Sequence, residues 1–81
     1  MKILVIARTT DPHRQSEALR AALGLTLRGA AVEVAVEEPL LAPLAQRAAD
    51  TLRSFGHRVH PLAGADLADA VGRADAVEVW T

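Results

Sequence analysis

Short apolar runs along the chain predict β-strands. The run in residues 2–7 is continuous, and unbroken hydrophobicity is typical of a strand that is buried on both faces. In residues 31–37, valine instead alternates with Glu33, Ala35 and Glu37, which is typical of a strand with one dry and one wet face. We therefore expect the first run to lie inside a sheet and the second to lie at its edge.

Two further strands are expected in residues 57–62 and 76–80. The first of these contains Pro61, which has no N–H to donate to a neighbouring strand and must therefore lie at the end of the strand. The second, Ala76-Val77-Glu78-Val79-Trp80, is rich in residues that favour strands.

The segments between these runs predict three helices. Thr10 or Asp11 can cap the first helix, with Pro12 in its first turn. This helix should extend to about Arg28, where Gly29 offers a left-handed stop. The second should run from about Pro43 to Phe55, and the third should begin near Asp66. The expected buried stripes are Leu19, Ala22, Leu23, Thr26 and Leu27; Leu44, Ala48, Thr51, Leu52 and Phe55; and Leu67, Ala70, Val71 and Ala74.

This alternation of strands and helices predicts a single α/β domain over residues 1–81. Three successive strand–helix–strand units with short loops favour parallel pairing and right-handed crossovers. We expect three layers, with three helices around a four-stranded, mostly parallel sheet. Of two reasonable strand orders we favour 2-1-3-4, because the first run is continuous and the second alternates.

The order 2-1-3-4 has a consequence for assembly. The first helix would cover one face and the other two helices the opposite face, which leaves the third and fourth strands bare on one side. Parallel sheets seldom have an open face, so we expect a homo-oligomer, a dimer or a trimer. Its interface would include Val77, Val79 and Trp80, with Leu25 from an apolar flank of the first helix. The alternative is a patch small enough to remain in water.

Composition and charge exclude several classes of protein. The chain is 51% hydrophobic, which is too apolar for a disordered chain. Its net charge is −1, and no basic stripe with interleaved aromatic residues is present, so we expect no nucleic-acid partner. No apolar run approaches the roughly 18 residues that span a membrane. Residues 2–6 are too short for a signal peptide, so we expect a cytoplasmic protein.

The chain contains no cysteine, which excludes disulfides, thiol nucleophiles and persulfide carriage. It also contains no asparagine, and arginine outnumbers lysine by eight to one. Avoidance of thermolabile residues is typical of thermophiles, but a GC-rich genome would give the same bias.

A candidate ligand site lies after the first strand. Ligands of open α/β sheets bind at the carboxyl ends of the strands, where the strand order reverses, and in the order 2-1-3-4 the loops there are residues 8–13 and 60–64. Arg8, Thr9, Thr10 and His13, with Asp11, would surround an anion at the helix N-terminus. The alternative is that Thr10 and Asp11 only cap the helix, since the loop lacks the glycines of a phosphate cradle.

Histidines and carboxylates offer little further chemistry. His13 and His60 could face each other across that crevice as an acid/base pair or part of a metal site; alternatively, they and His57 are unrelated surface residues. Glu37 and Glu38 are either paired carboxylates or a solvated strand end. No nucleophile with an adjacent base is visible, so we favour a protein without enzymatic activity, and we predict no cofactor or metal.

Five segments carry a resemblance to a known family. They are Lys2-Ile3-Leu4-Val5-Ile6, Thr9-Thr10-Asp11-Pro12, residues 17–25, Val32-Glu33-Val34-Ala35-Val36 and residues 74–80. Together they resemble the DsrE-like family, which includes small subunits of bacterial sulfur-relay complexes. The resemblance implies a small α/β fold that forms dimers, trimers or hexamers.

Active DsrE-like proteins carry sulfur as a persulfide on a cysteine, and this chain has none. No sulfur-carrier role therefore transfers. The function expected from the resemblance is that of a non-catalytic oligomeric protein with a role in assembly or in binding a protein partner. The alternative is a domain that binds a small molecule or an anion with the loop after the first strand.

Overall fold

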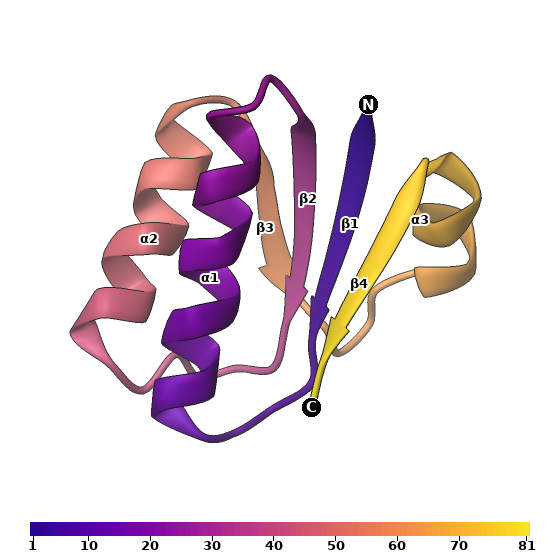
Figure 1. The fold of residues 1–81 in the computed structure, drawn as a ribbon. Coiled ribbons are helices and arrows are strands. Elements are labelled where there is room, and N and C mark those ends of the chain that lie inside the picture. Colours follow the sequence, from indigo (N-terminus) through magenta and orange to yellow (C-terminus); the bar gives the residue numbers. More distant parts are fainter.

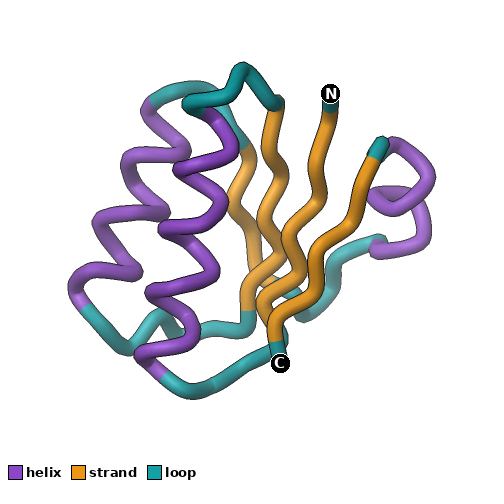
Figure 2. Tube along the Cα trace, viewed as in Figure 1, coloured by secondary structure: helices purple, strands orange, loops and turns teal.

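Four parallel strands form the central sheet, in the order β3-β2-β1-β4. The computed structural model describes all residues, 1–81. Figures 1 and 2 show helices on both faces of this sheet. The elements are β1 (Lys2–Ala7), α1 (Pro12–Thr26), β2 (Ala31–Val36), α2 (Pro43–Ser54), β3 (Arg58–Pro61), α3 (Leu67–Arg73) and β4 (Ala76–Trp80).

The element order and the α/β class are as expected, and all strand pairs are parallel, but the predicted strand order 2-1-3-4 is wrong. The second strand does not lie at the edge; it lies between β1 and β3. Consequently α1 and α2 share one face of the sheet, and the chain then crosses to the far side of β1. Because crossovers between parallel strands are right-handed, this reversal places α3 alone on the other face (Figure 1).

Glu33 is the cause of this error. Its charge made β2 resemble a strand with one wet face, yet the residue is only 5% exposed. A charged side chain can be buried when partners neutralise it, and Glu33 has such partners, described below. The alternating pattern therefore marked a buried ion pair and not the edge of the sheet.

The core is divided unequally between the two faces. The larger part lies under α1 and α2, where alternate residues of β1, β2 and β3 pack against both helices; its fully buried members include Val5, Val34, Leu19 and Leu52. The smaller part lies under α3 and contains Leu4, Ile6 and Ala70. A short helix therefore covers mainly β1 on that face, and little of β4.

The predicted stripes are correct at their centres and wrong at their ends. Leu19, Ala22, Ala48 and Leu52 are buried, as expected, but several expected core residues are exposed: Leu27 by 89%, Phe55 by 69%, Leu44 by 58% and Val71 by 45%. Ala18, Ala45 and Ala49 are buried in their place. α1 and α2 lie side by side on the sheet, so alanines form many of the close contacts beside Leu19 and Leu52. Leu27, Leu44 and Phe55 lie at the ends of these helices, where the sheet does not cover them.

Leu52 and Phe55 provide a direct check of this arrangement. Leu52→Ala empties a fully buried position and should lower the free energy of unfolding by about 2–5 kcal/mol. Phe55→Ala removes a mostly exposed ring and should cost about 0.5 kcal/mol. Urea unfolding followed by circular dichroism measures both values, and equal losses would contradict the orientation of α2.

Candidate functional site

The loop after β1 lies beside the end of β4. The Arg8 N–H donates to the Trp80 carbonyl oxygen at 2.8 Å. In the order β3-β2-β1-β4 the reversal lies between β1 and β4 and not between the first and third strands. The loop after β3 lies elsewhere, since the Leu62 N–H bonds to Val36 at the end of β2. Residues 8–13 and 60–64 therefore do not form the two sides of the reversal point.

Within the β1 loop, polar side chains bond to the backbone. The Thr9 hydroxyl accepts from the Asp11 N–H at 3.0 Å, and the Asp11 carboxylate accepts from the His13 N–H at 3.3 Å. Asp11 is thus the N-terminal cap of α1. Its negative charge lies where an anion at this helix end would bind. Arg8 and Thr10 are exposed.

Gln15 connects this loop to the one after β2. The side chain is 1% exposed. Its Nε2 lies 3.3 Å from the Thr9 carbonyl oxygen, 3.0 Å from that of Glu37 and 3.2 Å from that of Pro39. Its Oε1 accepts from the Leu41 N–H at 3.2 Å. The only signal for Gln15 in the sequence is an amide four residues before Leu19, on the buried side of the helix.

Trp80, expected at an interface, is partly covered by its own chain. The Arg14 guanidinium lies 5.2 Å from the centre of the indole ring, and Arg14 Nε donates to the Thr81 carbonyl oxygen at 3.1 Å. The indole N–H donates to Glu78 at 2.7 Å. The ring also packs against the larger core, as does Leu25. Both residues are therefore half-buried within the chain itself.

The two histidines of the expected crevice are separated by the sheet. His13 lies in α1, where its Nε2 is 2.6 Å from Glu17. His60 lies in β3 on the opposite face, which carries α3, and its Nε2 is 2.8 Å from Glu33 Oε2. The hypothesis that His13 and His60 form an acid/base pair is therefore wrong. Each ring is paired with a different carboxylate, on a different side of the sheet.

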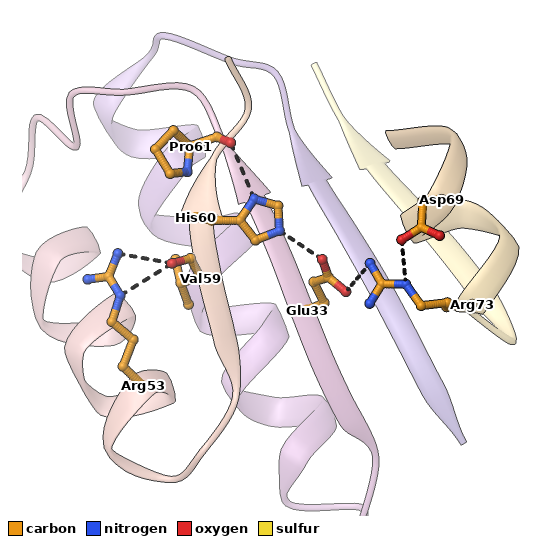
Figure 3. A network of polar contacts seen from close by, with 7 residues as sticks. All are labelled: Glu33, Arg53, Val59, His60, Pro61, Asp69 and Arg73. Atoms are coloured by element: carbon orange, nitrogen blue, oxygen red, sulfur yellow. Dashed lines mark hydrogen bonds and ion pairs between the residues drawn. The ribbon is translucent and has the colours of Figure 1, made fainter. Parts of the chain in front are cut away.

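The Glu33 network is the principal polar cluster of the protein, and Figure 3 shows it running from β3 across β2 to α3. Besides the contact with His60, Glu33 Oε1 lies 3.5 Å from Arg73 Nη2. Arg73 Nε in turn lies 3.0 Å from Asp69, and His60 Nδ1 lies 3.2 Å from the Pro61 carbonyl oxygen. Glu33 of β2 therefore links β3, through His60, to α3, through Arg73.

Electrostatics in this network favour the charged form of Glu33. Burial by itself raises the pKa of Glu33, but the hydrogen bond with His60 and the charge of Arg73 act in the opposite direction and prevail, so the pKa lies below its ordinary value. The charges of Arg58 and His60 lower it further. The ionised carboxylate thus stabilises the native arrangement of β3, β2 and α3.

The network leaves little room for chemistry. Both Glu33 oxygens and both His60 nitrogens already lie within bonding distance of protein groups, and Glu33 is almost completely buried. No group of three histidine or acidic side chains is placed to hold a metal ion. We therefore assign the network a structural role, the docking of α3.

β4 contributes the most exposed part of the sheet. On the α3 face, Val77 and Val79 are 43% and 54% exposed, although their partners in β1, Leu4 and Ile6, are buried by α3. Because the Trp80 carbonyl faces β1 and backbone groups alternate in direction along a strand, those of Val77 and Val79 face the open edge.

Comparisons with known proteins return no relative: no family model, no curated protein and no solved structure matches this chain. None of the helices has the length and apolar character required to cross a membrane. The functional interpretation therefore rests on the geometry of this chain.

Substituting Glu33 tests the network. Glu33→Gln removes the charge that pairs with Arg73 and His60, and it should lower the free energy of unfolding by about 2 kcal/mol near neutral pH. Because folding lowers the pKa of Glu33, the stabilisation is complete above the unfolded pKa, about 4.3. It is lost as the pH falls through the lower folded value.

The difference in free energy of unfolding between the unaltered chain and Glu33→Gln should therefore shrink as the pH is lowered from 5 toward 3. A series of urea titrations measures it. Glu38→Gln is the matched control, since Glu38 is exposed and makes no ion pair. A Glu33→Gln deficit that does not depend on pH would show that the charge of Glu33 is not what stabilises α3.

Proposed function

We propose that this chain is a non-catalytic, DsrE-like assembly protein that associates with a second copy of itself through β4. The exposure of β4 carries the proposal. The strand lies at the edge of the sheet, and Val77 and Val79 are about half exposed on the face that α3 only partly covers. Val71 of α3, 45% exposed, adds a third apolar side chain on the same side.

The backbone of β4 supports pairing between copies. The outward N–H and C=O groups of Val77 and Val79 have no strand beside them, and an unpaired edge is a template for another strand. Proteins commonly block such edges with lysine or proline, and β4 contains neither. Two β4 strands related by a twofold axis would pair antiparallel, so a dimer is the simplest assembly.

The register of that pairing can be narrowed by charge. A twofold axis at Glu78 would place the two Glu78 side chains directly opposite each other, and like charges opposite each other are destabilising. An axis at Val79 instead places Val79 opposite its own copy and Glu78 opposite Trp80 of the second copy. We favour the register centred on Val79, in which a valine pair lies at the axis and the two Glu78 carboxylates are not opposite each other.

The absence of cysteine supports the non-catalytic part of the proposal, because a persulfide cannot form without a thiol. The alternative function, anion binding by the β1 loop, has less support. In that loop the Asp11 carboxylate already accepts a backbone N–H of α1, and a second negative charge there would be repelled.

Light scattering tests the association. The chain should show a multiple of its 8.6 kDa monomer mass at high micromolar concentration. Val79→Lys should shift it to the monomer, with at least about a tenfold rise in dissociation constant. Because Val79 is exposed, the variant should keep its circular dichroism spectrum. Leu27→Lys, the same type of change at an exposed residue beside α1, is the matched control and should leave the mass unchanged.

Proline at position 79 tests backbone pairing along the edge of β4 separately from the contacts of its valine side chains. Val79→Pro removes an N–H that points away from β1, so the fold should survive while pairing through β4 is lost. A monomeric mass for the unaltered chain, or an assembly that tolerates both changes at Val79, would refute association through β4.

A further inference from the structure

The segment that carries α3 is bonded to the sheet backbone only at its two ends. Before it, the Leu62 N–H donates to the Val36 carbonyl oxygen at 2.8 Å; after it, the Asp75 N–H donates to the Lys2 carbonyl oxygen at 2.8 Å. Between these two bonds, the backbone hydrogen bonds of residues 63–74 stay within residues 62–74. We call residues 63–74 the α3 segment. It can therefore leave the sheet without breaking a strand pair.

One ion pair is the polar side-chain contact between the α3 segment and the sheet. Arg73 Nη2 lies 3.5 Å from Glu33 Oε1 (Figure 3), while the Nε of the same arginine pairs inside the helix. The other two helices have more such contacts. Gln15 of α1 bonds to the backbone of the loops after β1 and β2, and Arg53 of α2 donates to the Val59 carbonyl oxygen of β3 through two nitrogens.

The apolar attachment of α3 is small as well. α1 has five buried residues and α2 has four, but α3 has only Ala70. Isolated helices shorter than about 12 residues are marginal in water, so the seven residues of α3 depend on the sheet to stay helical. Segments with few buried apolar contacts open locally at a lower free energy than the core does. The α3 segment has the features of such a unit.

Release of the α3 segment would uncover a block of four apolar side chains. Leu4 and Ile6 of β1 are 1% and 7% exposed, and they pack against α3. In the register of the sheet, Leu4 lies beside Val77 and Ile6 lies beside Val79. The two valines are already about half exposed. With α3 in place, only the β4 half of this block is open; without α3, the block is continuous across β1 and β4.

We propose that α3 is a detachable cover: the α3 segment leaves the sheet as a unit while the four strands, α1 and α2 stay folded. The pair between Arg73 and Glu33 holds the cover closed. Opening changes how much apolar surface the sheet presents, because it adds Leu4 and Ile6 to the valines of β4. This conformational change goes beyond association through β4, which uses the edge of the sheet and needs no movement of α3.

Thiol labelling tests whether the cover opens by itself. The chain has no cysteine, so one introduced cysteine reports on one position. Leu4→Cys places a thiol under α3, and Val5→Cys places one on the opposite face of the same strand, in the core under α1 and α2. Both positions are fully buried. Under native conditions an aromatic disulfide reagent should label Leu4→Cys at least about tenfold faster than Val5→Cys, because local opening exposes only the first.

Hydrogen exchange followed by mass spectrometry separates release of α3 from global unfolding. Leu52→Ala weakens the core under α1 and α2, so it should accelerate exchange in α2 at least about tenfold and leave exchange in α3 unchanged. Arg73→Gln removes the pair with Glu33, so it should accelerate both exchange in α3 and labelling of Leu4→Cys at least about tenfold. Arg47→Gln, at an exposed arginine without an ion pair, is the matched control and should change neither.

Two results would overturn the proposal. One is equal labelling of Leu4→Cys and Val5→Cys, since both faces of the sheet would then open together. The other is equal acceleration of exchange in α2 and α3 by Leu52→Ala, which would make the whole chain one cooperative unit. Val34→Ala, a smaller change in the same core, gives this comparison if Leu52→Ala does not fold. Neither result depends on association through β4.

Discussion

The buried carboxylate of Glu33 is the interaction on which the arrangement of layers depends. A charge placed inside a sheet is costly unless it is paired, and Glu33 is paired from two sides, by His60 of β3 and Arg73 of α3. These contacts let β2 lie in the interior with a charged residue at its centre. They also hold a helix of seven residues, which buries only one of its own residues fully, against its face of the sheet.

The two faces of the sheet consequently differ in kind. Under α1 and α2 the contacts are dense and made largely by alanine and valine, so little of that face is open. Under α3 the apolar cluster has three buried members, and the polar network supplies the remaining contacts. β4 lies beyond both helical layers and keeps its valines exposed. The proposed association through β4 follows from this difference, because the helix that covers β1 is too short to cover its neighbour.

Small core residues also shape the face that α1 and α2 cover. α1 and α2 approach the sheet through Ala18, Ala45 and Ala49, with Leu19 and Leu52 buried beside them. The exposed large apolar residues Leu27, Leu44 and Phe55 lie at the ends of these helices. The centres of both helices are therefore closely packed, and the apolar surface that remains exposed lies at their ends.

Prediction from the sequence succeeded where the evidence was local. The seven elements, the proline at the end of β3 and the N-terminal cap at Asp11 all depend on residues adjacent in the chain. The first helix, expected to extend to about Arg28, ends at Thr26 with Leu27 as its C-cap, although Gly29 does adopt a left-handed conformation. The candidate site could not be found in this way. The separation of His13 from His60, the burial of Gln15 among three carbonyl oxygens and the partners of Glu33 all depend on which strands are neighbours.

The sequence by itself determined that the chain alternates strands and helices, that its strands are parallel, and that no thiol chemistry is available. Periodicity and composition carry this information because each element is specified by its own residues. Only the tertiary structure decided the strand order, and with it the faces that remain uncovered. A glutamate in a strand looks the same in sequence whether water or an arginine 40 residues away neutralises it, and that partner exists only once the chain has folded.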